Sequence, residues 1–155
     1  MPDDGVYLSP IRLQLTLTSA PGNEMCFVMP EPAGGGDLGL SGKFSIPKDY
    51  VGSPVLVARG IMDGAVDTND VHFGVQMLGL ADNEAYDAAL EAEDTATFQS
   101  NTYADEDVFE ETITLTVTLA VDDDVAYHFY IDDSGATPWT GNVLLTGLYF
   151  QYSDA

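Results

Sequence analysis

The residue types that most often carry catalysis are few in this chain, and they are not spaced for it. A serine nucleophile on a sharp turn needs the pattern Gly-x-Ser-x-Gly, and the nearest match, residues 39–43, lacks the final glycine. The triple glycine at residues 34–36 has no Lys-Ser or Lys-Thr after it and so is not a phosphate loop. The two histidines, His72 and His128, lie inside strand-like stretches. We expect both to be outward-facing or hydrogen-bonded strand residues, because no spacing around them supports a metal pair or a general base.

Acidic residues form three short clusters, at residues 104–107, 122–124 and 132–133. Calcium takes six to eight oxygen ligands, and neighbouring loops at one end of a sheet sandwich are able to supply them. However, no segment has the ligand order of a calcium loop, and each cluster stands where a turn is expected, a place that favours Asp regardless of metal. We therefore expect solvated turn acids and predict no metal or cofactor, with calcium kept as the alternative. The acids are also too abundant for a carboxylate pair to indicate glycoside hydrolysis.

Three aromatic residues are the candidates for a sugar-binding surface. Trp139 stands in a stretch rich in Gly and Pro, which suggests a loop and an exposed stacking platform, and Tyr50 and Tyr103 also fall in connections. The alternative is that these rings pack on the rim of a core or in a subunit interface. The single cysteine, Cys26, lies in an apolar run without a flanking base, so we expect a buried small hydrophobe rather than a reactive thiol.

The charge of the chain is lopsided and excludes two classes of partner. The 155 residues carry 26 Asp and Glu against 4 Lys and Arg, a formal net charge of -22. All four bases, Arg12, Lys43, Lys48 and Arg59, lie within the first 59 residues. Nucleic acids and anionic membranes bind through Lys and Arg, so we expect neither as a partner. Because 45% of the residues are hydrophobic, the chain has enough apolar surface for a core.

The elements that must position all of these residues are strands. In residues 111–121, for example, the apolar side chains of Ile113, Leu115, Val117 and Leu119 alternate with threonines, which predicts a half-buried strand. The same kind of pattern predicts further strands at residues 11–18, 25–29, 43–46, 55–62, 71–80, 95–100, 124–131 and 142–152.

One connection departs from this alternating strand pattern. Residues 83–94 begin with Asn and carry strong helix formers, which predicts a short helix. Residues 30–42 hold two prolines and five glycines and predict a flexible loop. We therefore divide the chain into an N-terminal strand-bearing arm with its loop, residues 1–42, and a main domain, residues 43–155. The expected fold is all-β, an antiparallel β-sandwich with the jelly roll as its topology.

Four stretches together resemble small β-sandwich proteins from the virions of tailed bacteriophages. They are residues 44–52, 71–90, 122–133 and 141–152, which hold a turn with Pro47, Tyr50 and Gly52, a helical connection and a closing aromatic strand. The resemblance implies a jelly-roll-like structural protein of the capsid decoration, head-fibre or tail-fibre type.

What the resemblance implies about function is a capsid decoration or cement protein, not an enzyme. Its partners would be further copies of itself, as a homotrimer, and the major capsid protein, and its location would be the virion after synthesis in the host cytoplasm. The start of the chain has no secretory signal pattern, which agrees with that location. The alternative is a tail-fibre or other receptor- or carbohydrate-binding β-sandwich module, which would use Trp139 together with calcium.

Overall fold

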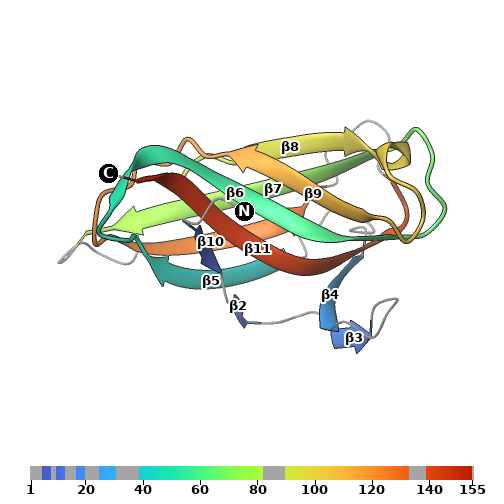
Figure 1. Cartoon of the computed structure of the whole chain (residues 1–155), viewed down its shortest axis with the longest axis horizontal. Helices are drawn as coiled ribbons and strands as arrows, with labels where there is room; N and C mark the ends of the chain where they lie inside the picture. Colours follow the sequence, from blue (N-terminus) through green and yellow to red (C-terminus); the bar gives the residue numbers. More distant parts are fainter. Residues whose placement is uncertain are drawn as a thin grey trace.

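Two antiparallel sheets pack face to face in the computed structural model of the chain, which describes residues 5–7, 10–12, 17–19, 25–30, 39–81, 90–132 and 139–154 (Figure 1). Sheet A has the order β3 (Leu17–Ser19), β4 (Met25–Pro30), β11 (Asn142–Asp154), β6 (Tyr50–Asp63) and β9 (Val108–Thr114), and β1 (Gly5–Tyr7) also pairs with β11. Sheet B has the order β2 (Pro10–Arg12), β5 (Gly39–Ser45), β10 (Asp124–Ile131), β7 (Asp70–Leu80) and β8 (Asp94–Gln99).

The order of the strands confirms the predicted jelly roll. From β4 onward the chain crosses to the opposite sheet at every connection except β7–β8, which is a hairpin within sheet B. This gives two four-stranded sheets with the orders β4-β11-β6-β9 and β5-β10-β7-β8. In each sheet an early strand lies beside a late one, β4 beside β11 and β5 beside β10. Interleaved Greek keys of this kind define the jelly roll. The helical structure in the described residues is one 3-10 turn, Ser100–Thr102, and none of it is long and apolar enough to cross a membrane.

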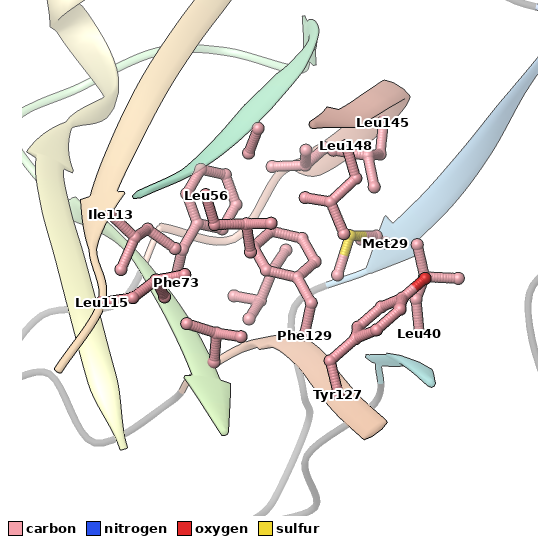
Figure 2. Close-up of a cluster of buried hydrophobic side chains, with 14 of the residues drawn as sticks. Met29, Leu40, Leu56, Phe73, Ile113, Leu115, Tyr127, Phe129, Leu145 and Leu148 are labelled. Atoms are coloured by element: carbon pink, nitrogen blue, oxygen red, sulfur yellow. The ribbon is translucent and has the colours of Figure 1, made fainter. Parts of the chain in front are cut away.

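The core lies between the sheets and follows from the period-2 pattern. Strand β7 turns Val71, Phe73, Val75 and Met77 inward, each at most 2% exposed, and the facing strands do the same. Figure 2 shows side chains from both sheets converging around Phe73 and Phe129, whose ring centroids lie 5.3 Å apart. Each large side chain buried in this way contributes about 1.5–3 kcal/mol to folding.

Glycine-rich composition proved a poor guide to the loop predicted at residues 30–42. Residues 39–42 belong to strand β5, which pairs with β10, so the loop prediction is wrong there; residues 31–38 lie outside the described residues. The reason is close packing, because a Cβ on Gly42 would lie 2.5 Å from the hydroxyl oxygen and 2.6 Å from two ring atoms of Tyr127. At this position the glycine makes room for an aromatic ring and does not mark a flexible segment.

The strand predicted at residues 111–121 forms only over its first four residues, and its ladder ends at Thr114. Beyond that point the backbone bonds to other groups: the Leu115 amide donates to the Pro54 carbonyl, and the Thr116 amide donates to the Asp94 carboxylate at 2.8 Å. Leu115 and Val117 nevertheless point into the core, as the alternation predicts.

Other predicted elements agree more closely. Strands β4, β7, β8, β10 and β11 confirm the patterns at residues 25–29, 71–80, 95–100, 124–131 and 142–152, and β6 begins earlier than predicted. Strands β2 and β3 cover the ends of residues 11–18, whose middle lies outside the described residues.

The predicted helix also falls largely outside the described residues, which omit 82–89. Residues 90–93 have no regular structure, and Asp94 begins β8, so the end of that prediction is wrong. On both sides of the proposed boundary at residue 42 the chain enters the sheets, since β1 and β4 pair with β11. The division into arm and domain stays a prediction.

Candidate binding face of sheet A

The outer face of sheet A carries a group of side chains that the sequence search did not single out. Strands β11, β6 and β9 place their outward residues side by side in register. The rows across the three strands are Gln151–Val55–Thr114, Tyr149–Val57–Thr112 and Gly147–Arg59–Glu110. We call these nine residues the sheet A face.

The ring of Tyr149 lies along strand β11 instead of projecting from it. A Cβ on Gly147, two residues earlier on the same face, would lie 2.7–2.9 Å from the Cε2, Cζ and Oη atoms of Tyr149. The ring therefore occupies the space that any larger residue at position 147 would fill. This holds one aromatic face against the sheet.

Tyr149 differs from the other aromatic residues whose side chains are described. The partly exposed Phe27, Phe44, Tyr50, Tyr103 and Tyr152 all pack against the core between the sheets. Tyr149 is also partly exposed but lies on the opposite side of β11 from the core residues Leu148 and Phe150. Among the Phe, Tyr and Trp side chains that the structure describes, it is the one that is partly exposed and lies outside that core.

An ion pair borders this ring. Arg59 is the cross-strand partner of Gly147, over which the Tyr149 ring lies, and its Nε atom is 3.3 Å from Oε2 of Glu110. Both side chains are solvent-exposed, at 45% and 57%, so the pair contributes little to stability. Its main effect is on charge, because it neutralises the guanidinium group beside the ring.

The chemistry available on the sheet A face is binding by stacking and hydrogen bonds. A partly exposed ring offers an apolar surface, and Gln151, Thr112 and the ion pair offer donors and acceptors around it.

Beyond the sheet A face, the outer side of sheet A carries buried apolar side chains. Cys26, Ile61 and Leu144 form a buried cluster there, with Val28 packed against it. Cys26 is 1% exposed, which confirms the prediction of a buried small hydrophobe.

The histidines and the serine of residues 39–43 lie on the outer face of sheet B. Ser41 Oγ is 2.8 Å from His128 Nδ1, and Thr97 Oγ1 is 2.7 Å from His72 Nδ1, so both histidines are outward-facing and hydrogen-bonded, as predicted. The Ser41–His128 contact has the distance of a nucleophile and its base. However, Ser41 is in mid-strand between β10 and β2, where the backbone amides are committed to the ladders and not arranged to receive an oxyanion.

The acidic clusters mainly serve the turns. Asp105 accepts the Gly64 amide at 3.0 Å, Asp107 accepts the Ala104 amide at 3.0 Å, and Asp123 accepts the Ala120 amide at 2.8 Å. Two neighbours, Glu106 and Asp122, have φ of 66° and 67°, which is typical of tight turns. Among the described residues, no three His, Cys, Asp or Glu side chains are grouped to hold a metal ion.

The aromatic candidates from the sequence belong to the core. Trp139 is 5% exposed and its Nε1 donates to the Ala65 carbonyl at 3.0 Å, so the prediction of an exposed platform is wrong. The reason is local geometry: the indole packs against Gly141 and Gly64, which leave space beneath it. Tyr50 and Tyr103 pack on the rim of the core, and burial raises the pKa of each phenol.

Sequence reasoning missed Tyr149 because it looked for aromatic residues in loops. The available signal was the spacing in residues 147–149, an outward Tyr two positions after an outward Gly in an alternating strand. Arg59 and Glu110 gave no such signal, since they are 51 positions apart and meet only through the pairing of β6 with β9.

Comparisons with known proteins give a coarse result. No family model and no curated protein matches the chain. Among solved structures, the xylan-binding module CBM15 is similar with a TM-score of 0.47 and 10% identity, covering 99% of this chain and 94% of that chain. A cleaved adhesin domain of Lys-gingipain from Porphyromonas gingivalis is similar with a TM-score of 0.45 and 15% identity, covering 97% and 93%.

At these identities and TM-scores neither likeness assigns a family or a function. The described structure bears out the small β-sandwich in the resemblance to phage virion proteins, and no comparison supports its virion part.

Proposed function

We propose that this chain is a non-catalytic carbohydrate-binding β-sandwich module and that the sheet A face is its binding surface. The observation that carries the proposal is the placement of Tyr149, partly exposed, outside the core and lying along β11 over Gly147. A jelly roll by itself hosts capsid proteins and lectins alike, so the function is argued from this face and not from the fold.

The physical basis is the two-sided nature of a sugar. A pyranose ring presents an apolar C–H surface, which stacks on an aromatic ring, and hydroxyl groups at its edge, which need hydrogen-bonding partners. Tyr149 supplies the first, and Gln151, Thr112 and the Arg59–Glu110 pair supply the second. Val57, at the centre of the face, is only 4% exposed, so we expect the sugar contacts to form at Tyr149 and at the exposed polar residues.

The first test is the substitution of Tyr149. We expect wild-type protein to be retarded in gels that contain a soluble neutral polysaccharide, from a panel of xylan, mannan and mixed-linkage β-glucan. Tyr149→Ala should lower the affinity about tenfold, because an aromatic contact is worth up to about 1.5 kcal/mol. Tyr149→Phe keeps the ring and should retain most of the binding.

The second test uses a matched pair of glutamines. Gln151 and Gln76 are both partly exposed but lie on the outer faces of opposite sheets. We expect Gln151→Ala to weaken binding several-fold and Gln76→Ala to leave it unchanged. Failure of the wild type to bind any of the glycans, or equal binding by Tyr149→Ala, would refute the proposed function.

The homotrimer, the capsid-protein partner and the virion location implied by the resemblance remain predictions. Mass spectrometry of purified particles tests them directly.

A further inference from the structure

We infer that Glu110 is a specificity-determining residue that restricts the sheet A face to uncharged polysaccharides; this rests on the proposed function. The inference starts from where the bases lie. Arg59 stands on β6 of sheet A, whereas Arg12 and Lys43 stand on strands of sheet B and Lys48 lies in the turn after β5. Arg59 is therefore the one base of the chain on a strand of sheet A.

An arginine beside a stacking ring would ordinarily favour acidic sugars. The planar guanidinium group binds a carboxylate through two parallel hydrogen bonds, which suits a uronic acid or a sulfated sugar. Arg59 is well placed for this, because it is opposite Gly147 and so beside the ring of Tyr149.

Glu110 already pairs with the Nε side of that guanidinium group. The distance from Arg59 Nε to Glu110 Oε2 is 3.3 Å, and the two residues are direct cross-strand partners. An acidic sugar would meet the negative charge of this carboxylate and would also approach a chain with a net charge of -22. A neutral sugar meets neither obstacle and is able to hydrogen-bond to the pair as it stands.

The experiment compares two polysaccharides at low salt: a neutral one that the wild type binds, and polygalacturonate. We expect wild-type protein to bind the neutral polymer and not polygalacturonate. Glu110→Gln frees the guanidinium group and should raise the affinity for polygalacturonate about fivefold or more, the equivalent of the roughly 1 kcal/mol that an exposed ion pair reaches. This gain should disappear in the double variant R59Q/E110Q and in molar salt.

The matched control is Glu91→Gln. It removes the same charge from an exposed glutamate of the β7–β8 connection, whose carboxylate makes no hydrogen bond among the described residues. An equal gain in Glu91→Gln would mean that net charge alone sets the preference and would overturn the inference. Circular dichroism and melting of each variant check that it is folded.

The two proposals fail in different ways. If the wild type binds no polysaccharide at all, the proposed function is wrong. If it binds the neutral polymer but Glu110→Gln gains no affinity for polygalacturonate, or if the wild type binds polygalacturonate as tightly, only the role of Glu110 is wrong.

Discussion

At the scale of single residues, Tyr103 shows how the acidic composition acts inside the structure. Its ring packs edge-on against Phe98, with centroids 5.4 Å apart, and its hydroxyl donates to Glu111 Oε1 at 2.9 Å. Burial raises the pKa of the phenol above its usual 10.0. The hydrogen bond to Glu111 and the negative charge of that residue raise it further. The neutral phenol is thus favoured in the folded state.

The sign of the pH dependence follows from this shift. Because the folded-state pKa lies above the unfolded value of about 10, the stabilising contribution is complete below that pH and is lost as pH rises through the folded-state pKa. We expect the free energy of unfolding to fall less steeply between pH 9.5 and 11 in Tyr103→Phe than in the wild type. At pH 7 the variant should lose about 1.5–3 kcal/mol with this hydrogen bond to a charged acceptor.

Urea denaturation at several pH values measures both effects. Tyr50→Phe is the matched control, since burial alone raises the pKa of Tyr50. Parallel pH profiles for the wild type and Tyr103→Phe would show that Tyr103 does not contribute.

At the scale of elements, the segment after β9 is held by side chains and not by a ladder. Asp94, the first residue of β8 in sheet B, accepts from both the backbone amide and the hydroxyl of Thr116, at 2.8 and 2.7 Å. The segment it anchors continues β9 of sheet A and buries Leu115 and Val117. Asp94 therefore ties the edges of the two sheets together where no strand pairing does so among the described residues.

We predict that Asp94→Ala destabilises the protein by about 1.5–3 kcal/mol, the range for hydrogen bonds to a charged acceptor. For a chain of this length the melting temperature should fall by roughly 3–10 °C. Asp105→Ala, which removes the acceptor of the single Gly64 amide, should have a smaller effect. Calorimetry of the two variants makes the comparison, and equal losses would argue against a special role for Asp94.

At the scale of the whole molecule, the bases of the chain do not gather on one side of the sandwich. All four bases lie within the first 59 residues, which would allow them to gather on one side of the sandwich. Instead Lys43 points outward from sheet B and Arg59 outward from sheet A, so these bases lie on opposite sides of the sandwich. Lys43 and Arg59 therefore do not share one less anionic face.

Self-repulsion at a net charge of -22 should still be measurable. We expect the melting temperature to rise by a few degrees between 10 mM and 1 M sodium chloride, because the Debye length shrinks from about 30 Å to about 3 Å. Sodium chloride is preferred to sulfate, which strengthens apolar burial in any protein. A melting temperature that stays constant over this range of salt would show that charge repulsion does not limit stability.

The alternation of apolar and polar residues along the chain predicted most of the strands correctly, but it did not identify the residues of the sheet A face. The period-2 pattern in residues 71–80 or 142–152 is local, so it identifies the strand and its buried side. Composition misled at Gly42, which makes room for the Tyr127 ring, and at Trp139, whose indole packs against Gly64 as well as the nearby Gly141. Such contacts depend on chain segments that the local pattern does not contain.

The sequence by itself therefore determined the class of the protein: an acidic all-β sandwich with a period-2 core and without a recognisable catalytic motif. Only the tertiary structure decided which residues meet. Tyr149 lies over Gly147 within one strand, but it is the pairing of β11 with β6 and of β6 with β9 that sets Arg59 and Glu110 beside it. Cross-strand neighbours are fixed by register between segments far apart in the chain, and register is a property of the folded sheet.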